Sequence, residues 1–306
     1  MLSPPRPLAF SEHPAALFLW QEVFGAPPGY FERYYEADPN YALGDTLGIW
    51  DEDLLVSAVH ICRRPAIWEK GVLLCGGIAN VATREEYRRQ GLSRTLLSEA
   101  IKKMEVEGYH FSLLGTGTPG HYSALGWEPV GRTQMTLAFS EVASSDITWE
   151  KVASIAPLAQ AYLRSARPLQ FLRLPDYFEG WVGWDWRRQG AQIGTTGEGD
   201  YLVLVADSAT GHPLPVLEWR ARDGAGEMSL FQAAAARARQ SGHPGLWLEA
   251  LPQYIGIEAL QAIGDVSQHI EGGGMIRNIT LSQDEYARAL QAYRAGLAAW
   301  WPGDGF

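Results

Sequence analysis

The 306-residue sequence predicts an α/β (α+β) fold with two mixed-sheet units in tandem, the second a degenerate version of the first. Two observations support this fold class. Short runs rich in β-branched residues alternate with amphipathic helical segments. The order strand, helix ending at glycine, strand, short helix ending at glycine, strand occurs in both halves. Because domains average about 150 residues, we expect units at 1–140 and 151–306, joined by a small polar linker at 141–150.

The first half is predicted to begin with two helices and a strand meander. A helix that connects two parallel strands follows. The expected elements are helices over 14–23 and 31–36, strands over 46–50, 54–61 and 72–81, a helix over 93–107, a strand over 111–114, a short helix over 122–125 and a strand over 133–139. The apolar residues of 93–107 recur at spacings of three and four, which is typical of a helix with one buried face. We expect 133–139 to close the first sheet.

The second half repeats the later part of this order. The expected elements are strands over 201–206 and 214–220, a helix over 228–240, a strand over 246–249, a short helix over 257–263, strands over 267–270 and 275–279, and a helix over 283–300. We expect 275–279 to close the second sheet. The similar order in the two halves indicates a duplication, although it is a likeness of pattern and not of residue identity.

Composition and charge exclude several classes of protein. Hydrophobic residues at 46% and charged residues at 20% are typical of a globular chain. A net charge of −10 argues against a nucleic-acid partner, because an acidic surface repels phosphates. Neither a signal peptide nor an apolar run of about eighteen residues is present, so we expect a cytoplasmic protein that does not enter a membrane. Cys62 and Cys75 are too few for a disulfide framework or a four-ligand site, so we expect buried thiols and no metal.

The segment from Val81 to Ser93 carries the most informative pattern, a strand end, a tight loop and a helix start. The first amides of a helix have no partner within the helix, and the helix dipole adds positive charge there. Such a position binds a diphosphate. Gly91 lets the backbone approach the phosphates closely, and Ser93 is small enough to do the same. Nearby arginines supply positive charge: Arg88, Arg89 and Arg94.

This loop resembles a known family. The hexapeptide 88–93 is similar to the Arg/Gln-x-x-Gly-x-Gly/Ala loop of the GCN5-related N-acetyltransferases (GNAT), with serine at the last position in place of glycine or alanine. The segment 120–130 looks like the family's Tyr-x-x-x-Gly-Phe element, in the correct order and at about the correct spacing. The resemblance implies two GNAT-like units with the acyl-CoA N-acyltransferase fold, and acetyl-CoA as cosubstrate.

The resemblance also implies roles for individual residues. The strand end would pair its backbone with the pantetheine arm, through Val81, Ala82 and Thr83. The loop amides would hold the diphosphate, through Arg88, Arg89, Gln90, Gly91, Leu92 and Ser93. A splay between 72–81 and 111–114 would admit the thioester, and amides near Val81 could polarise its carbonyl. Tyr122 would protonate the departing thiolate.

The general base is left open. The amine acceptor must lose a proton, directly or through water. The candidates by position are Glu69, His60, Asp51 and His121, and each is also readily explained as an ordinary polar residue.

The pattern is also similar to the enhanced-intracellular-survival group of bacterial acetyltransferases. Those proteins carry a second such fold without the cofactor loop and a sterol-carrier-like third domain, which this sequence ends too early to include. In that group a C-terminal carboxylate serves as the base, and the sequence here ends in Phe306. The second half lacks the loop: Gly224 and Gly226 are flanked by Asp223 and Glu227, which would oppose phosphate.

The second half is therefore predicted to be non-catalytic. It would wall the acceptor pocket, and the contributing aromatic residues would be Tyr177, Trp181, Trp184 and Trp186. For most of the twelve tryptophans of the chain, packing in the core is the favoured alternative.

The function predicted from these residues is transfer of an acetyl group from acetyl-CoA to a primary amine of a small molecule, by direct attack in a ternary complex. Two alternatives stay open: a non-catalytic acyl-CoA-binding sensor, and an acyltransferase that acts on a peptide or protein amine. Intact Tyr122 favours the enzyme. A homo-oligomer is compatible with each of these interpretations.

Overall fold

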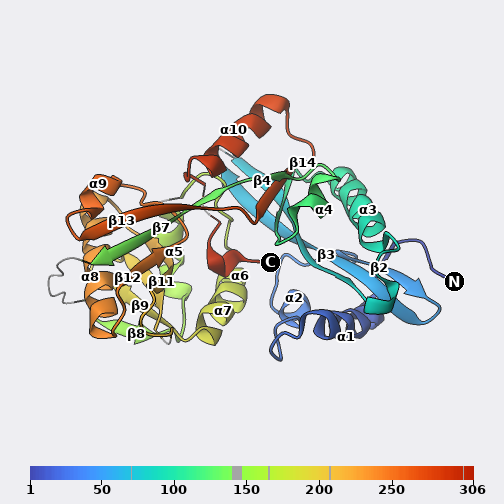
Figure 1. Cartoon of the computed structure of the whole chain (residues 1–306), viewed down its shortest axis with the longest axis horizontal. Coiled ribbons are helices and arrows are strands. Elements are labelled where there is room, and N and C mark those ends of the chain that lie inside the picture. Colours follow the sequence, from blue (N-terminus) through green and yellow to red (C-terminus); the bar gives the residue numbers. More distant parts are fainter. Residues whose placement is uncertain (70, 140–146, 165, 207, 299) are drawn as a thin grey trace. The chain divides into compact units, whose positions relative to one another are not determined.

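The computed structural model in Figure 1 describes residues 1–69, 71–139, 147–164, 166–206, 208–298 and 300–306. The chain forms two compact units. Unit 1 comprises Met1–Val130, Gly273–Leu290 and Phe306, and unit 2 comprises Gly131–Gly272 and Gln291–Gly305. Each unit contains one seven-stranded mixed sheet, which confirms the predicted fold class. Within the described residues, no helix is both long and apolar enough to cross a membrane.

The sheet of unit 1 combines long antiparallel strands with one parallel pair. Its strand order is β1 (Arg6–Pro7), β2 (Thr46–Asp51), β3 (Leu54–Trp68), β4 (Gly71–Thr83), β5 (Phe111–Gly115), β14 (Gly274–Asn278) and β6 (Glu128–Pro129). The helices are α1 (His13–Phe24), α2 (Arg33–Glu36), α3 (Leu92–Val106), α4 (Pro119–Ser123) and α10 (Gln283–Arg294), the last crossing the division between the units. Among the strands that the structure describes in this unit, only β4 and β5 pair in parallel, and α3 connects them.

The core of unit 1 explains why α3 forms where the sequence predicts it. The apolar face of α3 packs on the sheet through Leu92, Leu96, Leu97, Ala100, Ile101 and Met104. Alternation along β3 then separates the two faces of the sheet, because successive side chains point to opposite sides. Val59 and Ile61 join the α3 core, whereas His60 lies among aromatic rings of α1 and α2. Helices α1 and α2 therefore cover the face opposite α3 (Figure 1).

The sheet of unit 2 has a related plan. Its strand order is β13 (Gly264–Glu271), β7 (Arg132–Phe139), β12 (Gly245–Leu248), β11 (Leu214–Arg220), β10 (Tyr201–Val205), β9 (Ala191–Thr195) and β8 (Trp149–Lys151). The helices are α5 (Ala159–Arg164), α6 (Pro175–Tyr177), a π-helical turn (Phe178–Val182), α7 (Gly183–Arg188), α8 (Gly224–Gln240) and α9 (Ile257–Leu260). As in unit 1, one pair is parallel, β11 with β12, and a helix, α8, connects its strands.

Two predicted strand assignments are wrong, because the units exchange closing strands. Strand β7, expected in the first sheet, lies between β13 and β12 of the second. Strand β14, expected in the second sheet, pairs with β5 of the first. The sequence of a strand does not specify which strand it pairs with, so the pattern of apolar residues could not identify the partner.

The exchange also changes the division of the chain. It lies at Val130/Gly131, with Gly273–Leu290 returning to unit 1, and not at the predicted position 140. Of the predicted linker, 141–146 falls outside the described residues, and Trp149–Lys151 forms strand β8.

Candidate functional site

The parallel pairing of β4 with β5 is short. The two strands pair only from Cys75 opposite Phe111 to Gly77 opposite Leu113. Strand β4 then continues to Thr83, whereas β5 ends at Gly115. On its β5 side, the backbone of 78–83 has no paired strand among the described residues. This edge can therefore accept an extended ligand through the same hydrogen bonds that a strand would make.

A β-bulge interrupts β4 within the same segment. The register with β3 changes from Ala58 opposite Ala82 to His60 opposite Ala79, so β4 contains one extra residue. Asn80 has a φ of 51°, in the left-handed region, where asparagine is tolerated better than most residues. A bulge leaves the extra residue out of the ladder. The bulge leaves amides near Val81 outside the regular ladder, and their binding of a carbonyl oxygen stays a prediction.

The N-terminus of α3 lies a short loop beyond the end of β4. Gly91 precedes the helix with a φ of 79°, and no side chain caps the helix. The first helical hydrogen bond runs from the Thr95 amide to the Gly91 carbonyl. Arg89 also has a positive φ, 63°, whereas Arg88 before it has a φ of −67°. Residues of alternating φ sign turn neighbouring amides to one side of the backbone. Uncapped, convergent amides at a helix N-terminus form an anion site.

The second predicted motif lies beside this helix start. The Ser93 hydroxyl is 3.4 Å from Nε2 of His121. The Tyr122 ring packs edge-on against Trp127, with the ring centroids 6.2 Å apart. Burial raises the pKa of the Tyr122 phenol, opposed by a hydrogen bond with Thr116. The phenol is therefore protonated at neutral pH, as a proton donor must be.

The four candidate bases differ in what holds them. His60 is buried and its Nδ1 lies 2.8 Å from the Thr46 hydroxyl, and burial, with help from Arg64, lowers its pKa to about 3. Asp51 binds the terminal amino group and the Tyr87 hydroxyl.

Glu69 lies in the turn before β4 and pairs with Arg288 at 3.4 Å. This turn is roughly 30 Å along the strand from the bulge, at about 3.3 Å per residue. His121 is the one candidate that touches the start of α3, and burial and Arg94 both lower its pKa. Its role as a base stays a prediction.

Gly77 is a residue of this region that sequence reasoning missed. A Cβ at this position would lie 2.7 Å from the ring of Phe306, so the missing side chain leaves room for that ring on β4. Gly77 is also the last residue of β4 that pairs with β5. The signal was available, because a Gly-Gly pair inside a strand indicates a close approach.

The corresponding helix start in unit 2 is closed by carboxylates. Asp223 caps α8 by accepting a hydrogen bond from the Gly226 amide at 2.9 Å. Glu227 is buried and accepts from the Trp219 indole at 2.8 Å. It also accepts hydrogen bonds from three loop amides: Gln253 at 2.8 Å, Tyr254 at 2.7 Å and Ile255 at 3.0 Å. No phosphate can replace these groups without expelling two negative charges, which agrees with the prediction from sequence.

The aromatic residues proposed as a pocket wall in unit 2 mostly belong to its core. Tyr177, Trp181 and Trp186 are fully buried. Tyr177 stacks on Trp181, and Trp186 packs edge-on against Phe178. The pocket-wall interpretation is therefore wrong for these three and the packing interpretation is confirmed. Trp184 is half-buried beside Arg188.

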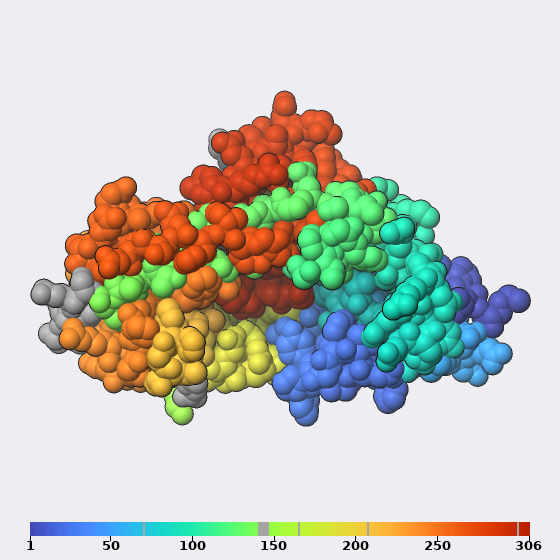
Figure 2. All heavy atoms as spheres, viewed as in Figure 1, coloured from blue at the N-terminus to red at the C-terminus, as the bar shows by residue number. Residues whose placement is uncertain are grey.

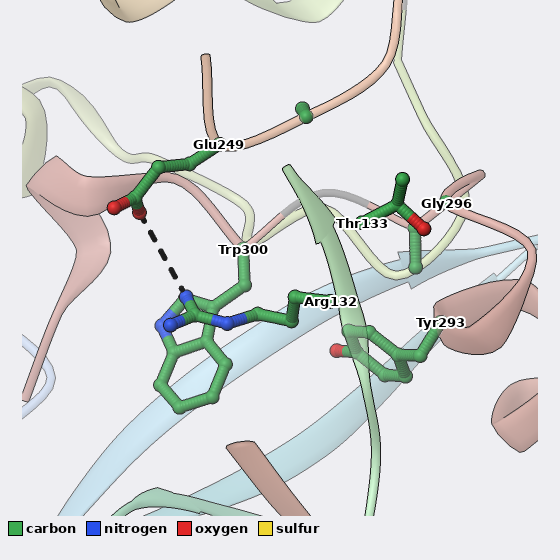
Figure 3. Close-up of a pocket in the computed structure, with 8 residues that line it drawn as sticks. Arg132, Thr133, Glu249, Tyr293, Gly296 and Trp300 are labelled. Atoms are coloured by element: carbon green, nitrogen blue, oxygen red, sulfur yellow. Dashed lines mark ion pairs between the residues drawn. The ribbon is translucent and has the colours of Figure 1, made fainter. Parts of the chain in front are cut away.

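A pocket in unit 2 is too small for an organic ligand (Figure 3). Arg132 lies over the Trp300 ring at 4.9 Å and forms an ion pair with Glu249 at 4.0 Å. The cavity beside them is about 10 Å³, close to the room that one water needs. Among the described residues, no group of His, Cys, Asp or Glu is arranged to hold a metal ion.

Comparison with known proteins identifies the domain that carries the β4 bulge and the open helix start. Residues 4–130 match the family model of the acetyltransferase (GNAT) domain. The chain carries a GNAT domain. The predicted resemblance is therefore confirmed, the match supports an acyltransferase, and a GNAT domain implies an acyl-CoA cosubstrate. No curated protein matches the sequence.

Solved structures share the fold of this chain across both units. A probable N-acyltransferase from Enterococcus faecalis V583 has a TM-score of 0.69 at 16% identity, over 91% of this chain and 73% of that chain. A GCN5-related N-acetyltransferase from Anabaena variabilis ATCC 29413 has a TM-score of 0.69 at 14% identity, over 92% and 73%. Eis1 from Mycobacterium abscessus has a TM-score of 0.66 at 15% identity, over 95% and 76%. The two-unit arrangement is thus similar to that of Eis1.

Proposed function

We propose that this GNAT protein transfers the acetyl group of acetyl-CoA to a primary amine of a small molecule, by direct attack within a ternary complex. One observation carries the proposal. The uncapped amides at the start of α3 lie one loop beyond a strand whose bulged edge has no partner strand among the described residues. An anion site next to an extended polar strand edge suits a ligand in which a diphosphate is followed by a pantetheine arm.

Each predicted cofactor residue has a distinct part in this binding. The amides of Gly91, Leu92 and Ser93 would hold the diphosphate, helped by the dipole of α3. Arg88, Arg89 and Gln90 form the exposed approach to that site. The strand edge Val81–Thr83 would pair with the amides of the pantetheine arm. Ala82 is buried and its carbonyl accepts from Ser57 at 2.8 Å, which anchors this edge to β3.

The chemistry then requires little from side chains. A neutral amine attacks the thioester carbonyl, and the negative charge that develops on oxygen would be stabilised by the amides of the β4 bulge. As the carbon–sulfur bond breaks, the Tyr122 phenol would give its proton to the thiolate. The proton that the attacking nitrogen loses would pass through water and restore the phenol. Holding both substrates together supplies much of the rate. The net charge of −10 supports a cationic acceptor, because the field of the protein raises its local concentration.

A thiol-release assay with acetyl-CoA tests the proposal, run against aminoglycosides, polyamines, aryl amines and lysine-bearing peptides. Replacing Tyr122 by Phe should lower kcat by about 100-fold or more, because a general acid is lost. The affinity for CoA, measured by calorimetry, should stay nearly unchanged. Trp127→Phe, which keeps an aromatic ring against Tyr122, is the packing control. Tight CoA binding without turnover on any amine would instead indicate a sensor, and turnover only on peptides would indicate a protein acceptor.

A further inference from the structure

We propose that the groove between α1 and α2 of unit 1 binds an organic cation with an apolar body. This site is separate from the acyl-CoA site and does not depend on the proposed reaction. Two adjoining cavities of about 330 and 320 Å³ form the groove, and they share Pro14, Leu17 and Glu32. Ligand pockets commonly begin at about 300 Å³. The blue atoms of the two helices lie exposed on the face of unit 1 drawn in Figure 2.

The groove lies on the side of α1 that faces away from the sheet. Ala16, Leu19 and Trp20 are fully buried and form the sheet-facing side of the helix. Leu17 and Phe18 lie on the other side, and Phe18 is 64% exposed. The layer formed by α1 therefore stands between this groove and the β4 edge assigned to the thioester. A ligand in the groove would not touch the reacting atoms.

Aromatic rings form one end of the first cavity. The His13 ring stacks on Tyr35 with a centroid distance of 3.9 Å and an interplanar angle of 2°. Phe10 meets His13 edge-on at 5.2 Å and is 77% exposed. His13 is held by the Tyr41 hydroxyl at 2.7 Å, and burial lowers its pKa, so the ring is neutral at pH 7. Neutral aromatic rings arranged around a cavity can offer their negative π faces to an ammonium group.

Two carboxylates complete the cavity and select the sign of the ligand's charge. Glu32 precedes α2 and Glu36 is its last residue, about one turn further on, and both line the groove. Within the described part of the chain, neither carboxylate takes part in an ion pair, whereas the nearby Glu12 and Glu22 are paired with Arg6 and Arg84. Two uncompensated negative charges beside neutral rings attract an ammonium group and repel anions.

The remaining charged group of this helix does not neutralise the groove. The Arg33 guanidinium lies over the Tyr30 ring at 4.7 Å and near Tyr34 at 5.6 Å. Arg33 is buried and is not among the groove-lining residues. The chemistry that fits the groove is therefore a quaternary or alkylated ammonium attached to an aromatic or aliphatic group, which would cover Leu17 and Phe10.

Calorimetry with benzyltrimethylammonium chloride tests this site on the full chain. We expect saturable binding that weakens as salt rises, and a loss of roughly tenfold in affinity in the E32Q/E36Q double variant. Phe10→Ala should weaken binding by about threefold. The double variant E105Q/E258Q is the matched control, because it also removes two carboxylates, from exposed positions on α3 and α9 outside the groove, and should change nothing. A thermal melt of each variant checks that it is folded.

Three results would overturn the proposal. The first is no binding by the wild-type chain at millimolar probe. The second is binding that E32Q/E36Q leaves unchanged. The third is a concentration-dependent dimer that Phe18→Ser dissociates, since the groove would then be covered by a second copy. Failure of the thiol-release assay bears on the acyl-CoA site alone.

Discussion

Helices α3 and α8 occupy the same place in their units but present opposite chemistry at their first turns. Each connects a pair of parallel strands that share only three paired positions. Each preceding strand carries an extra residue, near Asn80 in β4 and near Leu217 in β11. The start of α3 has no side-chain cap, whereas Asp223 and Glu227 supply carboxylates at the start of α8. The same backbone plan therefore leaves the helix start uncapped in unit 1 and occupied by two carboxylates in unit 2.

The strand ends beyond the two bulges also differ, because the end in unit 1 is partly exposed and uncharged and the end in unit 2 is buried and charged. In unit 1, Val81 and Thr83 are partly exposed and apolar or neutral. In unit 2, Glu218 and Arg220 are fully buried. Arg173 donates to Glu218 at 2.7 Å and to Asp304 at 2.8 Å, with all three side chains enclosed. Internal ion pairs therefore fill the region of unit 2 that corresponds to the open edge of unit 1.

The largest effect is expected from Arg173→Met, which tests how far this buried network holds unit 2 together. Removing the guanidinium leaves Glu218 and Asp304 buried without their cation, and such a loss costs about 3–5 kcal/mol of unfolding free energy. Chemical denaturation would measure it. Arg187→Met, which breaks the exposed pair with Glu179, should cost less than about 1 kcal/mol and serves as the control. A small loss in Arg173→Met would show that the network contributes little.

Ser93→Asp should make the start of α3 resemble that of α8. A carboxylate in the first turn would repel the diphosphate by about 3 kcal/mol. The affinity for CoA should therefore fall roughly 100-fold. The same carboxylate complements the helix dipole and should leave stability equal or slightly higher. Calorimetry with CoA and a thermal melt would measure the two effects. Ser98→Asp, further along α3, is the matched control, and equal losses in both variants would contradict a diphosphate at the helix start.

Glu227→Gln makes the reverse test in unit 2. The amide keeps one acceptor but brings an N–H group against the loop amides, so stability should fall by about 1–3 kcal/mol. Binding of CoA should not appear at α8, because Asp223 still caps the helix. Denaturation and calorimetry would report both. A second CoA bound per chain in this variant would show that a single carboxylate keeps the site closed.

The smallest effect concerns the pH dependence of stability near α3. The pKa of His121 is lowered in the folded chain, by burial first and by Arg94 second. As the pH falls, His121 therefore takes up a proton in the unfolded chain before it does so in the folded chain. The stability that neutral His121 contributes is lost as pH falls below about 6.5. Replacing His121 by Gln should make the thermal unfolding midpoint depend less on pH between pH 7 and pH 5.5. An unchanged pH profile would contradict the lowered pKa.

Local features of the fold were predictable from sequence, and non-local ones were not. The period of apolar residues fixed α3 to within a residue, because one helix face must be buried. The loop proposed to bind the cofactor was visible because Gly91 and the nearby arginines stand out between a strand and a helix. The exchange of β7 and β14 was missed because pairing partners leave no mark on a strand's own pattern.

Two features of the site were hidden for the same reason. The bulge at Asn80 depends on the register between β3 and β4, which no single segment encodes. The packing of Phe306 on Gly77 joins residues from opposite ends of the sequence. Trp181 and Trp186 are buried because of tertiary packing. The high number of tryptophans in the sequence could not show whether these two lie in a core or line a pocket.

The return of Gly274–Asn278 to the first sheet has a consequence for synthesis of the protein. During translation, β5 leaves the ribosome more than a hundred residues before β14, the strand that pairs along its outer edge, exists. The sheet of unit 1 therefore cannot be completed until most of unit 2 has been synthesised. An expression plasmid cut after residue 140 would yield a chain with an exposed strand edge and a tendency to aggregate.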